Sequence, residues 1–282
     1  MLTKRSMLIL KGSKVILNNR FLSASPQIKT DFANGVKEIV MCNSQTRNAL
    51  SIEMMKNLIY HLTSDQQNKE LRVIVISGEG PAFSAGHNLK ELASDQSKQQ
   101  ECFQLASELM NKIIDCPVPV IAKVDGIAAA AGCQLVAQCD MAVASERSMF
   151  STPGANFGIF CSTPGVALAR SIPKTSALYM LFTGSPVSAK EAFRIGLITK
   201  MCAEQKLNEE VENICNTIKA KSRDIIELGK TFYYQQIHYN VKKAYELGGK
   251  KMQENLQVPD CKEGIQSFIE KRKPRWGTPS TR

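Results

Sequence analysis

The hydrophobic residues of this chain follow two patterns that alternate along most of its length. Runs dominated by apolar residues predict strands at 35–43 (GVKEIVMCN), 72–80 (RVIVISGEG), 117–126 (PVPVIAKVDG) and 140–145 (DMAVAS). The run at 72–80 is rich in β-branched residues and ends in glycines, which is typical of a strand buried on both faces.

Apolar residues at helical spacing predict helices between these runs. After a polar turn, Ser51 is a candidate N-cap for a helix whose apolar face holds Met54, Met55, Leu58, Ile59 and Leu62. A polar-rich helix is predicted at about 97–114. Strands that alternate with helices indicate an α/β fold with largely parallel strand pairing.

Only helical patterns follow from about residue 206 onward. They cover LNEEVENICNTIKAKS, VKKAYELGGKKMQENL and KEGIQSFIEKRKPRWG. We therefore expect a core over residues 31–220 and a C-terminal helical region over 221–282. Helices without strands suit an appendage that packs on another surface, often another subunit, so this region is predicted to mediate oligomerisation.

The composition is that of a soluble globular protein: 43% of the 282 residues are hydrophobic and 22% are charged. The chain has no apolar stretch near the roughly 18 residues that a membrane span needs. The formal net charge is +10, but residues 1–30 hold six bases and no acid, which leaves +4 for the remainder. This excess is too modest to make nucleic acid an expected partner.

The basic, acid-free segment 1–30 resembles a mitochondrial transit peptide. A disordered cytosolic tail is the alternative. A nucleic-acid-binding arm is disfavoured because no aromatic residues alternate with the bases. The nine cysteines are scattered and form no CxxC pair, so neither a disulfide framework nor a metal site is expected. A reducing compartment, such as the mitochondrial matrix, fits this pattern.

Two loops rich in small residues are the candidates for chemistry. They read GPAFSAGHNLKEL at 80–92 and DGIAAAAGCQLVAQCD at 125–140. Each follows a predicted strand and precedes a helix, where backbone N–H groups lack acceptors. Two such loops can direct two N–H groups at one oxygen, which makes an oxyanion hole. Tight helix–strand packing through alanine and glycine would give the same composition, and the pattern alone leaves both interpretations open.

Several segments, in order, resemble the enoyl-CoA hydratase/isomerase (crotonase) superfamily. They include TRNALS, RVIVISGEGPAFSAGHNLKEL, PVPVIAKVDGIAAAAGCQLVAQCDMAVAS, LFTGSPVSAKEAFRIGLITKM and EGIQSFIEKRKPRW, and the resemblance covers about 35–276. It implies an α/β spiral of β-β-α turns, a C-terminal helical region, and homotrimers or dimers of trimers. It also implies acyl-CoA thioester ligands and no separate cofactor, since coenzyme A is part of the substrate.

The resemblance also assigns site residues. The backbone N–H groups of His87 and Ala131 match the family's two oxyanion donors. In the same way, the substrate-binding residues are expected to be Ala85, Gly86, Asn88 and Leu89, beside the coenzyme A channel, and Phe268 and Lys271. The last two match a C-terminal segment that reaches a coenzyme A commonly bound by a neighbouring subunit, with the lysine on a phosphate.

The chain departs from the family hydratases at both catalytic glutamates. The matching positions are Gln134, in GCQL, and Gly154, in STPG. A neutral amide cannot take a proton from water near pH 7, and glycine has no side chain. Positioned acid–base groups typically contribute about 10²–10⁴-fold, so hydration is expected to be severely impaired. Family isomerases that keep only the second glutamate are not matched either, because that position is Gly154.

A few other residues are candidate substitutes for the missing glutamates. His87 could act through its imidazole, although its family position is used for the N–H. Cys133 and Cys161 have no base close in sequence, Asp140 matches a structural aspartate, and Gln134 could hold a water or the acyl group.

The sequence therefore predicts an acyl-CoA-binding mitochondrial protein of fatty acid metabolism with an intact oxyanion hole. An enzyme with another reaction, such as decarboxylation, thioester hydrolysis or a specialised isomerisation, is one alternative. A non-catalytic binder or regulatory oligomer is the other.

Overall fold

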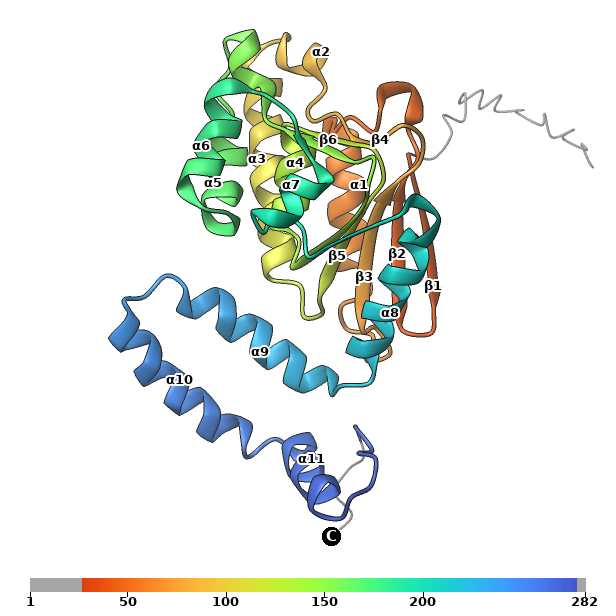
Figure 1. Cartoon of the computed structure of the whole chain (residues 1–282), viewed down its shortest axis with the longest axis vertical. Helices are drawn as coiled ribbons and strands as arrows, with labels where there is room; N and C mark the ends of the chain where they lie inside the picture. The colour runs from red at the N-terminus through yellow and green to blue at the C-terminus, as the bar shows by residue number, and fades with distance from the viewer. Residues whose placement is uncertain (1–26, 278–282) are drawn as a thin grey trace, which may run out of the picture.

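A computed structural model describes residues 27–277, which form two small sheets wrapped by helices and a trailing group of C-terminal helices (Figure 1). The six strands of the larger sheet run in the order β1-β2-β3-β5-β7-β10. Their bounds are Ile28–Ala33, Val36–Met41, Val73–Gly78, Val120–Val124, Met141–Ser145 and Lys200–Cys202. β1 and β2 form an antiparallel hairpin, and every later pairing in this sheet is parallel.

The smaller sheet has four short strands in the order β4-β6-β8-β9. Their bounds are Ala82–Ser84, Ile127–Ala129, Met149–Ser151 and Val187–Ser188. Three successive turns of the chain, β3-β4, β5-β6 and β7-β8, each give one strand to each sheet and then continue into helices. The predicted α/β spiral of β-β-α turns is confirmed.

Eleven α-helices and three 3-10 turns complete the described part of the chain. The helices of the core are α1 Ile52–Thr63, α2 Leu89–Leu92, α3 Gln96–Ile114, α4 Ala131–Gln138, α5 Ser162–Ser171, α6 Lys174–Thr183, α7 Ala189–Arg194 and α8 Leu207–Lys219. The C-terminal helices are α9 Arg223–Gln236, α10 Val241–Asn255 and α11 Pro259–Ile269. The 3-10 turns are η1 Ser44–Thr46, η2 Pro153–Phe157 and η3 Glu204–Lys206.

The four strands predicted from apolar runs are the central strands β2, β3, β5 and β7 of the larger sheet. β3 is buried on both faces, as its sequence indicates. Ile74 and Ile76 belong to the main core that also holds α1, α3 and α4, whereas Val73 and Val75 pack in a second cluster with α8. The predicted cap of α1 is also confirmed, because the Ser51 hydroxyl accepts a hydrogen bond from the Met54 N–H at 3.1 Å.

The predicted leader lies almost wholly outside the described residues. Only its end, residues 27–30, is described, and there β1 begins at Ile28 and pairs with β2. The folded sheet therefore starts earlier than the core boundary expected at residue 31.

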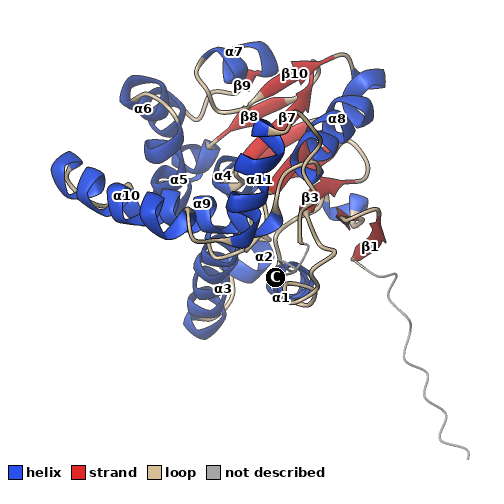
Figure 2. Ribbon diagram, turned by 90° about the horizontal axis from the view of Figure 1, so that it is seen from below, coloured by secondary structure: helices blue, strands red, loops and turns tan. Residues whose placement is uncertain are grey.

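The C-terminal helices contact the core sparsely. α10 has no buried residue, and Figures 1 and 2 both place it at the periphery. α9 is anchored at Lys230, whose Nζ donates to Asp140 Oδ2 at 2.7 Å and to the carbonyls of Ile113 and Val118 at 2.9 and 3.0 Å. The Tyr234 hydroxyl donates to Asp140 Oδ1 at 2.9 Å. Asp140 thus has the structural role expected of it, since it fixes α9 against the core.

No helix between residues 27 and 277 combines the length and apolar character required to cross a bilayer.

Candidate functional site

The loop after β4 is held in place by backbone hydrogen bonds to the segment before α1. The N–H groups of Ala85 and Leu50 donate to the carbonyls of Arg47 and Gly86 at 2.9 and 2.8 Å. The Ser84 hydroxyl donates to the Asn48 carbonyl at 2.8 Å. These bonds fix the backbone that leads into His87.

The loop after β6 contains a strained residue. Ala130 has φ 50° and ψ −118°, a conformation that suits glycine and costs other residues about 1–3 kcal/mol. It is held because its N–H donates to the Ser151 carbonyl at 2.9 Å and its own carbonyl accepts from the Gln134 N–H at 3.0 Å. This turn starts α4 at Ala131, which is therefore the first helical residue and has no intrahelical acceptor for its N–H.

The two loops approach each other so closely that only glycine fits between them. Gly86 has φ +91°, and a Cβ there would lie 2.9 Å from the Ala129 carbonyl oxygen and 3.2 Å from the Ala131 nitrogen. A Cβ on Gly132 would lie 2.4 Å from the Ser84 carbonyl oxygen. The tight packing that the composition suggested is therefore present, and it brings the two donor loops together.

The amides of His87 and Ala131 remain available for a ligand. Within residues 27–277, neither N–H donates a hydrogen bond to another residue. Two unpaired donors on adjoining loops can bind one carbonyl oxygen and stabilise negative charge on it.

The imidazole of His87 is packed against α3. Its Nδ1 lies 3.3 Å from the Leu50 carbonyl oxygen and 3.5 Å from Cys102 Sγ, and its ring meets Phe103 edge-on at 5.6 Å. Burial lowers the pKa of this histidine below 6.5, and it raises the pKa of the Cys102 thiol to about 11. The ring's Nε2 is buried without a hydrogen-bond partner in the described structure. The lowered pKa makes the imidazole a weak base, which favours the backbone role of His87.

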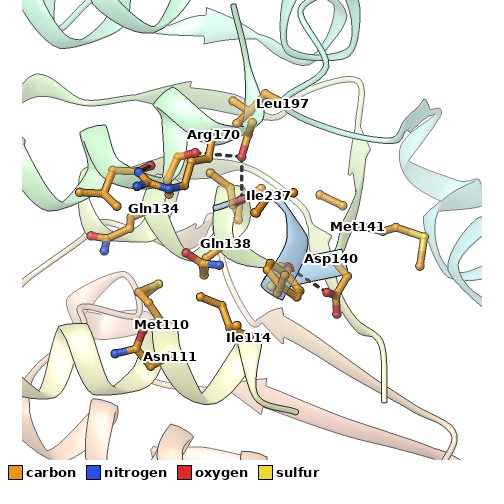
Figure 3. Close-up of a pocket in the computed structure, with 18 of the residues that line it drawn as sticks. Met110, Asn111, Ile114, Gln134, Gln138, Asp140, Met141, Arg170, Leu197 and Ile237 are labelled. Atoms are coloured by element: carbon orange, nitrogen blue, oxygen red, sulfur yellow. Dashed lines mark hydrogen bonds between the residues drawn. The ribbon is translucent and has the colours of Figure 1, made fainter. Parts of the chain in front are cut away.

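Gln134 follows Ala131 by one turn on α4 and lines a pocket (Figure 3). Its side chain is 4% exposed, and its Oε1 has no hydrogen-bond partner in the described structure. A buried amide oxygen without a donor is costly, which makes it a natural partner for a ligand or a water. The position of the first missing glutamate is therefore open to the pocket.

Gly154, at the second missing glutamate, is in the opposite situation. A Cβ there would lie 2.2 Å from the Ile159 carbonyl oxygen and 2.7 Å from Cys161 Sγ. The Ile159 N–H donates to the Gly154 carbonyl at 3.0 Å, which holds the segment after η2 in that place. The space that a side chain would need is filled by backbone.

The nearby thiols are also unsuited to nucleophilic chemistry. Burial raises the pKa of Cys161 and raises that of Cys133 to about 12. The nine cysteines, all within residues 27–277, form no disulfide with one another. Across residues 27–277, no cluster of three His, Cys, Asp or Glu side chains is arranged to hold a metal.

The other expected substrate-binding residues fall into two groups. Ala85 and Leu89 are exposed beside the donor loop, and the Asn88 side chain caps α2 by accepting from the Lys90 N–H at 3.1 Å. Phe268 is 85% exposed on α11, and Lys271 follows that helix at φ 56°. α11 and α2 lie at opposite ends of the molecule in Figure 1, so Phe268 and Lys271 do not join the site of their own chain.

Sequence reasoning missed Asn111 on α3 and Arg170 on α5. Both line the pocket that holds Gln134. Neither belongs to a local motif, because they reach the pocket through the packing of α3 and α5 around α4. For Arg170, the sequence offers only the helical periodicity of the segment 162–171. That periodicity does not show which part of the protein the polar face of this helix contacts.

Comparison with known proteins places the chain. The family model described as "Enoyl-CoA hydratase/isomerase" matches residues 31–279. "Enoyl-CoA hydratase domain-containing protein 3, mitochondrial" is 50% identical in Homo sapiens and 49% identical in Rattus norvegicus, each over 245 residues. These alignments cover 86% of this chain and 81% and 82% of the relatives.

Solved structures agree with these matches. The crystal structure of human enoyl Coenzyme A hydratase domain-containing protein 3 superimposes with a TM-score of 0.87 at 47% identity, covering 89% of this chain and all of that one. A Mycobacterium smegmatis enoyl-CoA hydratase structure gives 0.87 at 39% identity, covering 90% of this chain and 100% of that one. The range matched by the family model includes both donor loops and the two altered positions 134 and 154.

Proposed function

The chain belongs to the enoyl-CoA hydratase/isomerase family, and on that premise we propose that it binds acyl-CoA thioesters without carrying out ordinary hydration. The observation that carries the proposal is the approach of Gly86 to the nitrogen of Ala131, which sets two unpaired N–H groups on adjoining loops. The thioester oxygen accepts from the amides of His87 and Ala131, and this polarises the carbonyl. Ala85, Asn88 and Leu89 border the route of the coenzyme A.

The proposal limits the chemistry that follows binding. Hydration needs one group to activate water and another to deliver a proton, and Gln134 supplies neither. Gly154 has no room for a side chain on the present backbone. The polarised thioester remains, so a reaction that needs only carbonyl activation is still possible, as is binding alone. We favour acyl-CoA binding in fatty acid metabolism, with a non-catalytic regulatory oligomer as the second candidate.

Thioester recognition can be tested on the unaltered protein. Isothermal titration calorimetry should compare butyryl-CoA with S-butyl-CoA, a thioether that lacks only the carbonyl oxygen. We expect the thioester to bind about 10–100-fold more tightly, because two donors lose their acceptor in the thioether. Equal affinities would overturn the oxyanion assignment.

Two variants then locate the donors. Ala131→Pro removes one N–H at a helix position where proline is tolerated, so the preference for the thioester should fall sharply. Ala131→Gly keeps the N–H and should retain the preference. Circular dichroism of both variants checks that each is folded. A preference that survives in Ala131→Pro would exclude this amide as a donor.

The C-terminal helices support a further part of the proposal, which is assembly into homotrimers or dimers of trimers. α10 and α11 carry exposed apolar side chains, among them Tyr245 at 80%, Met252 at 60%, Ile269 at 66% and Phe268 at 85%. Such surfaces are typical of interfaces. In the assembly, Phe268 and Lys271 of one subunit would reach the coenzyme A of another. A stable monomer by sedimentation at micromolar concentration would refute this part.

A mitochondrial location is proposed from residues 1–30 and from the names of the human and rat relatives. The matrix fits the lack of disulfides among the nine cysteines of residues 27–277. Fusing residues 1–30 to a fluorescent reporter should direct it to mitochondria. A diffuse cytosolic signal would contradict the proposal.

A further inference from the structure

The pocket begins beside Gln134, one turn after Ala131, and follows α4 to its C-terminal end. Ala131, Gln134 and Gln138 are spaced by three and four residues, so their side chains share this face. At about 1.5 Å of rise per residue, the last two lie about 4.5 and 10.5 Å along the helix from Ala131. The cavity has a volume of about 560 Å³, which lies within the usual range for small-molecule sites. An acyl group whose carbonyl is held at Ala131 would meet this cavity at Gln134 if it follows the shared face of α4.

The lining of this cavity combines apolar side chains, such as Ile114 and Leu197, with polar ones. Polar side chains reach it from α3, α4, α5 and the segment after α9, among them Ser107, Asn111, Gln134, Gln138, Arg170 and His238. A plain alkyl chain would remove water from these groups and satisfy none of them, which is unfavourable. The unpartnered Oε1 of Gln134 is already in that state. The cavity thus favours an acyl group with polar atoms of its own.

Arg170 is an exposed residue at the edge of the cavity and has no carboxylate partner among residues 27–277. Its Nη1 donates to the Val166 carbonyl one turn earlier at 3.0 Å, and no carboxylate of residues 27–277 lies within ion-pair distance of it. Asp140 also borders the cavity, but its two oxygens already bind Lys230, Tyr234 and the Val120 N–H. The acid of the pocket is therefore neutralised, while the arginine retains free donors.

Figure 3 shows how these groups are distributed. Gln134, Asn111 and Arg170 lie toward one side of the pocket, and Asp140 and Met141 lie toward the other. The Ser171 hydroxyl donates to the Ala137 carbonyl at 3.0 Å, which fixes the end of α5 beside the end of α4. Arg170 is therefore held next to the half of α4 that an acyl chain would follow after leaving the donor loops.

We propose that this pocket takes a short acyl group with a carboxylate at its far end, and that Arg170 binds that carboxylate. The inference rests on the proposed binding of acyl-CoA thioesters at His87 and Ala131. A guanidinium presents paired N–H groups that match the two oxygens of a carboxylate, so it discriminates strongly against a methyl terminus. Arg170 is a binding residue in this proposal and takes no part in proton transfer.

The test compares two ligands of equal chain length, glutaryl-CoA with a terminal carboxylate and valeryl-CoA with a terminal methyl group. Calorimetric Kd values are measured for the full-length protein and for Arg170→Gln. We expect the unaltered protein to prefer glutaryl-CoA by about 10–100-fold, and Arg170→Gln to lose that preference while binding valeryl-CoA as before. Arg170→Lys, which keeps the charge without the fork, should show an intermediate preference.

The matched control is Arg194→Gln. Arg194 pairs with Glu191 on the exposed surface of α7 and does not line this pocket, so the substitution changes net charge equally. It should leave both affinities unchanged. Valeryl-CoA bound as tightly as glutaryl-CoA by the unaltered protein would overturn this inference alone. An equal loss of both ligands in Arg170→Gln would assign Arg170 to the coenzyme A phosphates instead. Failure of both ligands to bind would reject the proposed function and this inference together.

Discussion

The two halves of the candidate site differ in what they are made of. The donor half consists of backbone: the amides of His87 and Ala131, set by a glycine at φ +91° and an alanine at φ 50°. The acid–base half would consist of side chains at positions 134 and 154, and there the chain has an amide and a glycine. Backbone donors survive changes of side chain as long as the loops keep their shape. A proton-transfer role at positions 134 and 154 would depend on the side chains there, so the two halves can differ in function.

The two positions of the acid–base half, 134 and 154, also differ from each other. Gln134 faces an open pocket with an unpartnered oxygen, whereas the side-chain space of Gly154 is occupied by the Ile159 carbonyl. Position 134 has an amide where a carboxylate would fit, whereas position 154 has no space for a side chain.

The largest expected effect concerns hydration itself. We expect the unaltered protein to hydrate crotonyl-CoA at least about 10²–10⁴-fold more slowly than a two-glutamate member of the family, because acid and base are both absent. Loss of the enoyl-thioester absorbance measures the rate. On the sequence alone, Gln134→Glu with Gly154→Glu would be expected to restore activity. With the Ile159 carbonyl oxygen 2.2 Å from the position of the new Cβ, the structure leads us to expect no restoration.

Two outcomes would contradict that expectation. Robust hydration by the unaltered protein would mean that a water held by Gln134 or another group replaces the carboxylates. Recovery in a folded double variant would mean that the segment after η2 moves aside readily. Gln134→Glu alone, which needs no new space, serves as the control for folding and for acyl-CoA binding.

The next prediction concerns the ion pair between Lys230 and Asp140, which attaches α9 to the core beside the pocket. Lys230→Met leaves Asp140 buried without its cation, and breaking a buried ion pair costs about 3–5 kcal/mol. We expect this loss in the free energy of unfolding by urea denaturation. Lys243→Met, on an exposed i,i+3 pair with Glu246, should change it by less than about 1 kcal/mol. Equal losses would show that Asp140 does not anchor α9.

A smaller effect tests the filled position directly. Gly154→Ala adds one carbon where the backbone of Ile159 already lies, and we expect a loss of about 1–3 kcal/mol in the free energy of unfolding. Gly158→Ala is not a suitable control because its φ is +73°, whereas Gly229→Ala on α9 meets no atom within 4 Å. Gly229→Ala should be neutral or stabilising. A neutral Gly154→Ala would show that the loop yields.

The smallest expected effect concerns His87. If it acts only through its N–H, His87→Gln should keep acyl-CoA binding within about 3-fold, and binding should not follow a histidine titration between pH 6 and 8. Its folded pKa lies below the unfolded value near 6.5, so its share of stability is complete above pH 6.5 and is lost as the pH falls through the folded pKa. Thermal unfolding at pH 7.5 and 5.5 should therefore show a smaller acid loss in His87→Gln. A steep loss of binding in this variant would restore a role for the imidazole.

The sequence predicted the parts of the fold that long patterns encode. Strands β2, β3, β5 and β7 could be predicted because runs dominated by apolar residues, bounded by turn residues, are typical of buried strands. The strands of the smaller sheet were missed because two or three residues show no periodicity. β1 was missed because five of its six residues are exposed, so its sequence lacks the alternation of a half-buried strand.

The site shows the same limit. The donor loops could be predicted because a run of glycine and alanine between a predicted strand and a predicted helix is recognisable in the sequence. The contacts of Arg170 and the filled space at Gly154 depend on segments that meet only after folding. The sequence does not distinguish a glycine with free space beside it from a glycine whose side-chain position is occupied by another segment.

The filled space at Gly154 has a consequence for how this chain can change over evolutionary time. Regaining a carboxylate at position 134 takes one substitution into an existing opening. Placing one at 154 requires the segment around Ile159 to withdraw first, because any side chain there meets the Ile159 carbonyl oxygen. A carboxylate can therefore be placed more easily at position 134 than at position 154. A single substitution of this sequence can therefore place a carboxylate at position 134, whereas one at 154 also needs a change of the backbone.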